Sequence, residues 1–221
     1  MCPLKNDFKI RKPKGFRIFK SDTELTSDMS TWEEITLPVN FYKFVINGQP
    51  YRIGEIELYY FCSNHLDHYV HKDPLQLEFD NIYFHRYKNG SYKGMDFSFG
   101  RKSENIYLSL LIRTIQNCNT GEVITGPCNT VNHILSVLGH QSVENLVTTA
   151  GGTINFTIPN TFIYLQPQSS CLSEDILHGP RVGLSDKYPT FKNLSYRFVS
   201  SKMIKQIKKQ KTGLQIFWRQ S

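Results

Sequence analysis

Two glutamates and a tyrosine occupy alternate positions in the apolar stretch Tyr51–Tyr60. The stretch is rich in Ile, Leu and Tyr, which predicts a β-strand. Side chains two residues apart share one face of a strand. Glu55, Glu57 and Tyr59 should therefore point to one side, and the residues between them should point into the core.

The acidic face of this strand has two possible interpretations. In the first, it is the wet face of an edge strand, and Glu55 and Glu57 are ordinary solvated carboxylates. In the second, one Glu lies at the floor of a pocket and acts as a general base, with Tyr59 and a His as walls. Partial burial and a neighbouring carboxylate both move the pKa of such a base toward the working pH.

Three histidines, His65, His68 and His71, follow this strand at intervals of three residues, with Asp67 and Asp73 interleaved. Imidazole and carboxylate groups at this spacing could in principle bind a transition metal. No further ligand motif accompanies them, and His beside Asp in a loop is more often simply polar. We therefore expect no metal site here.

The five cysteines are scattered and include no Cys-x-x-Cys pair, which argues against a disulfide framework and a structural zinc site. Cys62 and His65 are close enough in sequence to form a nucleophilic pair, but nothing marks Cys62 as activated. No apolar run reaches the ~20 residues of a membrane span, and the N-terminus has no secretory signal. We expect an intracellular protein, in the nucleus or the cytoplasm.

The net charge of +7 favours polyanionic partners, above all nucleic acid. Two basic runs, Lys9–Arg17 and Lys202–Lys211, lie near the termini and could be solvated tails. In His85–Gly94, aromatic residues alternate with Lys and Arg. This pattern suits contacts with backbone phosphates and stacking on bases.

Two Asn-Gly pairs predict the β-hairpins that position these residues. Val39–Ile46 and Tyr51–Tyr60 flank Asn47-Gly48, which is a strong hairpin signal requiring positive φ in the turn. Asn81–Tyr87 and Tyr92–Phe99 similarly flank a turn that contains Asn89-Gly90.

A long apolar run at residues 105–116 predicts a buried strand, and Arg113 within it should be paired or face a site. Helical spacing predicts helices at residues 129–138 and 141–148. Together these elements indicate a single α+β domain over residues 32–221, with antiparallel hairpins and a few flanking helices. Residues 1–31 are basic and polar, and we expect this segment to be partly disordered.

Seven short motifs occur in the order typical of the alkyladenine (3-methyladenine) DNA glycosylase family, which the chain resembles over roughly residues 39–200. The family has a Val-Glu-Thr-Glu-Ala-Tyr signature followed by a His nine residues after its Tyr, a spacing that Glu57, Tyr59 and His68 reproduce. The motifs are Gly54–Tyr60, His68, Lys93–Met95, Leu111–Arg113, Gly126-Pro127, Gly179–Gly183 and Tyr196–Phe198.

This resemblance implies a monomeric base excision repair enzyme with a curved, mostly antiparallel sheet. Such an enzyme flips a damaged purine out of double-stranded DNA and hydrolyses its N-glycosidic bond, without a cofactor. By position, Glu57 would be the general base that activates water. Tyr59 and His68 would contact the flipped base, and Arg113 would help to hold the water or a phosphate.

The chain departs from the family pattern at residues that read the base. The family's Asn that guards against guanine falls near Gly100, and Lys93 replaces the Tyr of the Tyr-Gly-Met motif. Tyr92 could substitute as the wedge that fills the DNA stack, and Tyr87 is the nearest counterpart of the second stacking Tyr. These differences leave open a catalytically altered or inactive module that binds nucleic acid or a nucleotide.

Overall fold

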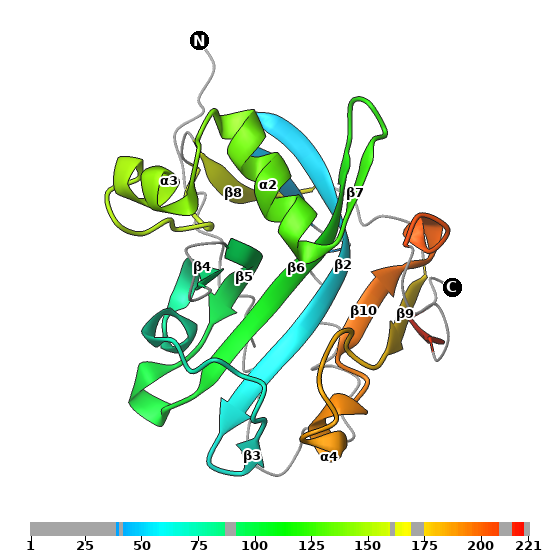
Figure 1. Ribbon diagram of the computed structural model, residues 1–221. Coiled ribbons are helices and arrows are strands. Elements are labelled where there is room, and N and C mark those ends of the chain that lie inside the picture. Colours follow the sequence, from blue (N-terminus) through cyan, green and yellow to red (C-terminus); the bar gives the residue numbers. More distant parts are fainter. Residues whose placement is uncertain are drawn as a thin grey trace.

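Antiparallel strands form one curled sheet, and a few helices pack against it (Figure 1). This computed structural model describes residues 39, 42–86, 92–159, 162–168, 175–207 and 214–218. The predicted α+β domain with a curved antiparallel sheet is confirmed. The N-terminal segment 1–31 lies outside the described residues.

The strands and helices follow one another along the chain with short connections. Their bounds are β1 Tyr42–Ile46, β2 Gln49–Cys62, β3 His65–Leu66, the 3₁₀ helix η1 Pro74–Leu77, β4 Phe79–Arg86, β5 Tyr92–Phe99, η2 Lys102–Glu104, β6 Tyr107–Asn117, β7 Val123–Thr125, α2 Pro127–Leu138, α3 Val143–Thr149, β8 Ile163–Pro167, β9 Ile176–Gly179, α4 Pro189–Lys192, β10 Arg197–Ser200, η3 Ser201–Met203 and β11 Gln215–Trp218. None of the helices in this part of the chain is long and apolar enough to cross a membrane.

The long strand β2 lies at the centre of the sheet and carries the predicted acidic face. The main strand order is β11-β9-β10-β2-β6-β5-β4. Strands β1 and β3 also pair with β2, β7 pairs with β6, and β8 pairs with β1. The 14 residues of β2 and the 11 of β6 run side by side through the middle of the molecule (Figure 1).

Both predicted hairpins form. Asn47 and Gly48 have φ values of 48° and 74°, and Ile46 pairs with Gln49 across this two-residue turn. Positive φ at both positions is the conformation that Asn-Gly adopts at low cost. Strands β4 and β5 also pair in antiparallel fashion, but their Asn89-Gly90 turn lies outside the described residues.

The sheet separates a large core from a smaller apolar cluster. On β2, Ile56, Leu58 and Tyr60 belong to the main core. Tyr59 instead packs with Val70 and Leu111 in a second cluster. The alternation of β2 therefore separates a packing face from a face that carries carboxylates and an aromatic ring, as the period of two predicts.

Two irregularities between β2 and β6 turn Arg113 toward that second face. The register passes from Ile53↔Ile115 to Glu55↔Thr114 and then to Ile56↔Ile112, which leaves Arg113 without a partner across the ladder. A bulge of this kind redirects a side chain and is common beside functional sites. Arg113 and Thr114, although adjacent in the sequence, consequently both reach the carboxylate of Glu55.

Some local details differ from the sequence-based expectations. The segment between β6 and α2 contains the short strand β7, which folds back along β6. Strand β8, Ile163–Pro167, pairs with β1. The predicted helix at 129–138 begins two residues earlier, with Pro127 in the first turn, where its missing N–H costs little.

Candidate active site

Glu57 is fully buried, and its carboxylate accepts two hydrogen bonds and forms an ion pair with Arg113. One of its oxygens, Oε1, accepts the backbone N–H of Val182 at 2.7 Å and lies 3.3 Å from Nη1 of Arg113. The other, Oε2, accepts the hydroxyl of Tyr59 at 3.2 Å. Since a carboxylate offers about four acceptor positions, Glu57 retains capacity for one further donor.

Glu55 is also buried, but it is held by two guanidinium groups. Its Oε1 accepts Nε of Arg113 at 3.1 Å and Nε of Arg197 at 2.7 Å. Its Oε2 accepts the hydroxyl of Thr114 at 2.7 Å. The interpretation of both glutamates as solvated carboxylates on a wet strand face is therefore wrong, because β10 and the segment around Val182 cover them.

The environment of Glu57 raises its pKa, so this carboxylate accepts a proton more readily than an ordinary Glu does. Burial raises the pKa of Glu57, and the charge of Arg113 and the hydrogen bond from Val182 only partly oppose this shift. Burial, followed by the charge of Glu57, raises the pKa of Tyr59 well above its usual value. Tyr59 therefore remains a hydrogen-bond donor to Glu57 throughout the neutral range.

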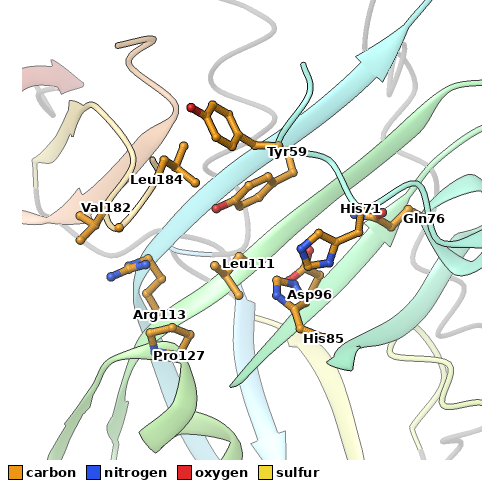
Figure 2. Close-up of a pocket in the computed structure, with 12 residues that line it drawn as sticks. Tyr59, His71, Gln76, His85, Asp96, Leu111, Arg113, Pro127, Val182 and Leu184 are labelled. Carbon is orange, nitrogen blue, oxygen red and sulfur yellow. The ribbon is translucent and has the colours of Figure 1, made fainter. Parts of the chain in front are cut away.

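A cavity of about 240 Å³ opens beside these residues. Its walls combine aromatic and aliphatic side chains with a few polar groups, namely Tyr59, Tyr69, His71, Gln76, His85, Asp96, Leu111, Arg113, Pro127, Val182, Gly183 and Leu184. Figure 2 shows Arg113 and Val182 on one side of Leu111, and His71, His85 and Asp96 on the other. All three partners of Glu57 line this cavity, although Glu57 itself does not.

Asp96 and two histidines form the polar side of the cavity that the sequence did not predict. His85 Nε2 lies 2.6 Å from Asp96 Oδ1, and Ser109 donates its hydroxyl to Asp96 Oδ2 at 2.6 Å. His71 Nδ1 lies 2.8 Å from the hydroxyl of Tyr83, and the two imidazole rings are 4.7 Å apart. The only available signal was a carboxylate in the buried run of β5, which, like Arg113 in β6, required a partner.

The backbone of η1 packs against Gly100, where the resemblance would place a guarding Asn. A Cβ on Gly100 would lie 2.0 Å from the carbonyl oxygen of Gln76, so this position has no room for a side chain. The side chain of Gln76 lines the cavity instead. Its Oε1 accepts the N–H of Asp73 and its Nε2 donates to Ser109, which fixes its orientation.

His68 does not line the cavity with Tyr59 and Arg113, although the resemblance placed it beside the base. The side chain is exposed and stacks on Tyr188 at 4.6 Å between ring centroids. Its neighbours in sequence occupy the interior: Asp67 pairs with buried Arg181 at 2.7 Å, and the hydroxyl of Tyr69 donates to the carbonyl of Ser185. Anchoring both neighbours turns His68 outward, and Tyr69 lines the cavity instead.

Several other predicted residues cannot be placed in the site. Tyr87 lies outside the described residues. Tyr92 and Lys93 begin β5, but the structure describes only their backbone. The wedge and second stacking positions therefore remain predictions.

Two other kinds of site were possible in the histidine-rich loop, a metal site and a Cys–His nucleophilic pair, and neither forms among the described residues. Within the described ranges, no group of three or more His, Cys, Asp or Glu side chains could hold a metal ion. Cys62 is buried and accepts the hydroxyl of Tyr60, whereas His65 Nε2 lies 3.3 Å from the hydroxyl of Tyr196. The suggested Cys62–His65 pair therefore has no hydrogen bond between its members.

No family model matches the chain. It is similar to "Uncharacterized protein L759" of Acanthamoeba polyphaga mimivirus, with 40% identity over 186 residues, covering 77% of this chain and 84% of the relative. Identity of this size over most of both proteins indicates common descent and a shared fold. The chain therefore belongs to the same family as this mimivirus protein, whose name states no activity.

Proposed function

We propose that the chain hydrolyses the N-glycosidic bond of a base flipped out of double-stranded DNA, as in base excision repair. The main support is a buried Glu57 whose pKa is raised by burial and whose three partners all line one cavity. A general base needs a pKa near the working pH and a fixed orientation. Burial moves the pKa of Glu57 upward, toward the working pH, and the contacts with Val182, Tyr59 and Arg113 fix its orientation.

In the proposed reaction, Glu57 removes a proton from water as the water oxygen attacks C1′ of the sugar. The bond between C1′ and the base nitrogen breaks, and its electron pair leaves with the base. Arg113 and the N–H of Val182 hold the Glu57 carboxylate in place through Oε1, and Oε2 accepts the hydroxyl of Tyr59. In this mechanism the attacking water takes the remaining position on Oε2, and because Glu57 is fully buried, a wall residue must shift to admit that water.

The size and lining of the cavity suit a single flipped base. At about 240 Å³ it is smaller than the ~300–1,000 Å³ sites that take drug-sized ligands, so it fits one ring system better than a nucleotide. Tyr59 and Tyr69 offer aromatic surface, and Leu111 offers apolar surface. Extruding a base costs a few kcal/mol, least for a damaged base, and selectivity would begin there.

A binding module on the same scaffold is the second candidate. This candidate is favoured by the complete burial of Glu57, which does not line the cavity. Arg113, Tyr59 and Val182 do line it, and they would lie between Glu57 and a ligand. In this alternative Glu57 only orients Arg113, and the protein recognises nucleic acid or a nucleotide without cleaving it.

Base release from a panel of duplexes separates the two candidates. Purified protein in excess is incubated with duplexes containing one alkylated or one deaminated base, and the released base is quantified alongside duplex binding at several salt concentrations. The enzyme releases at least one base. The binding module releases none but binds the duplex, with log affinity falling by about 0.9 per phosphate contact against log salt.

A further inference from the structure

A chain of hydrogen bonds shows which groups donate to the carboxylate of Asp96. Gln76 Nε2 donates to the hydroxyl of Ser109 at 2.9 Å, and that hydroxyl donates to Asp96 Oδ2. Asp96 is fully buried, so its other oxygen requires a donor, which His85 Nε2 supplies at 2.6 Å. The ring of His85 is thereby held with Nε2 protonated and facing Asp96.

The other edge of His85 is available to a ligand. Among the described residues, Nδ1 of His85 has no hydrogen-bond partner, and about 13% of the side chain is exposed at the cavity. A Cβ on Gly94 would lie 2.8 Å from this nitrogen and 2.9 Å from Cδ1 of Leu111. Only a glycine at this position leaves room between the two side chains.

The charges facing His85 favour its protonated form. Burial alone would lower the pKa of His85, but the charge and hydrogen bond of Asp96 outweigh burial and raise it. Burial, followed by the charge of His85, lowers the pKa of the adjacent His71. The fully buried carboxylate of Asp96, 2.6 Å from Nε2, therefore favours the protonated form of His85, which has a second donor at Nδ1.

We propose that His85, oriented by Asp96, reads the edge of the bound base as a hydrogen-bond donor. The cavity then takes a neutral ring that carries an acceptor on that edge, and rejects a ring with a fixed positive charge. This inference rests on the proposed function for its ligand class. A cationic ring would meet His85 on one side and Arg113 on the other, and would leave a buried donor without an acceptor.

Equilibrium binding of free bases tests this selectivity without any bond cleavage. Calorimetry at pH 6 compares 9-methyladenine with 7,9-dimethyladeninium, in which a methyl group on N7 brings a positive charge and removes the N7 acceptor. It includes 9-methylhypoxanthine as a carbonyl probe. A hydrogen bond from a charged donor corresponds to about 10-fold to 100-fold in affinity. The intact wild type should prefer the neutral base to the cation by at least about tenfold.

Two variants locate the effect. His85→Gln, which is neutral, should reduce the preference for the neutral base by about tenfold, whereas His140→Gln, at a histidine outside the cavity, should leave it unchanged.

If His85→Gln does not fold, raising the pH of the wild type provides the same test. Deprotonated His85 keeps Nε2–H toward Asp96 and turns Nδ1 into an acceptor, so the preference should fall. Three titratable neighbours, His71, Tyr83 and Glu57, also bear on this pH dependence, and Asp73 adds a negative charge that acts on His85.

Equal or tighter binding of the cation, an unchanged preference in His85→Gln, or no binding of any base would overturn the inference. The proposed function fails separately: if selective binding occurs but no duplex releases a base, His85 reads a base that the protein does not excise.

Discussion

The two polar sides of the cavity differ in how completely their groups are satisfied. On the glutamate side, Arg113 pairs with both Glu55 and Glu57, both carboxylates are buried, and Glu57 keeps one acceptor position. On the histidine side, Asp96 is enclosed, but His85 presents a ring nitrogen to the cavity without a partner among the described residues. The glutamate side is therefore a rigid cluster of charges that hold one another, whereas His85 faces the cavity and can bind a ligand there.

Removing the charge of Glu55 should have the largest effect on stability. Glu55→Gln leaves Arg113 and Arg197 buried with an incomplete counter-charge. Breaking one partner of a buried ion pair costs about 3–5 kcal/mol. Urea unfolding should show this loss, whereas Glu78→Gln, in a partly exposed pair with Lys102, should cost at most about 1 kcal/mol. Similar midpoints for the two variants would show that Glu55 is not needed to balance the arginines.

Adding a methyl group on the histidine side should have an intermediate effect. The Cβ in Gly94→Ala would lie within 3 Å of both His85 and Leu111, so the two side chains must separate. Overpacking of this kind costs about 1–3 kcal/mol. We expect a lower thermal midpoint and weaker base binding. Binding at wild-type strength would mean that the Nδ1 edge of His85 does not contact the ligand.

The two sides should produce opposite limbs of a pH–rate profile. Glu57 must be ionised to act as a base, so its raised pKa places the acid limb above the ordinary range of a Glu carboxyl, about 4.3. His85 must be protonated to donate from Nδ1, so activity should fall as pH rises through its pKa, above about 6.5. His85→Gln should remove only the alkaline limb. Loss of the acid limb in that variant would reverse the assignment.

Replacing His68 should have the smallest effect, because this side chain is exposed and lies outside the cavity. His68→Ala loses its stacking on Tyr188, for which we expect about 0.5–1.5 kcal/mol of stability at most. The rate of base release should change by less than about threefold. A loss of release comparable to that of a variant on the cavity wall would show that the loop turns His68 inward when DNA binds.

Local signals predicted the fold and one side of the cavity. Asn47-Gly48 fixed the first hairpin, and alternation along β2 placed Glu57 and Tyr59 on one face. Arg113 was conspicuous as a charge in an apolar run, and the structure pairs it with both glutamates. In each case the information lies within one or two adjacent strands.

The histidine side depends on contacts that no local pattern specifies. His71, His85 and Asp96 come from a loop and two strands, and only the folded sheet brings them together. The orientation of His68 depends on the Asp67–Arg181 pair, whose members are 114 residues apart. The spacing shared with the glycosylase signature singled out His68 in the sequence, but it did not specify the direction of the His68 side chain.

Single-turnover base release by Glu57→Gln tests the central claim most directly. The substitution is nearly isosteric, so the variant should keep its circular dichroism spectrum and its affinity for the duplex. A positioned general base contributes about 10²–10⁴-fold, so the rate with the best duplex should fall by at least about 100-fold relative to wild type. A rate within about threefold of wild type, with binding intact, would contradict the account and show that Glu57 only supports the cavity wall.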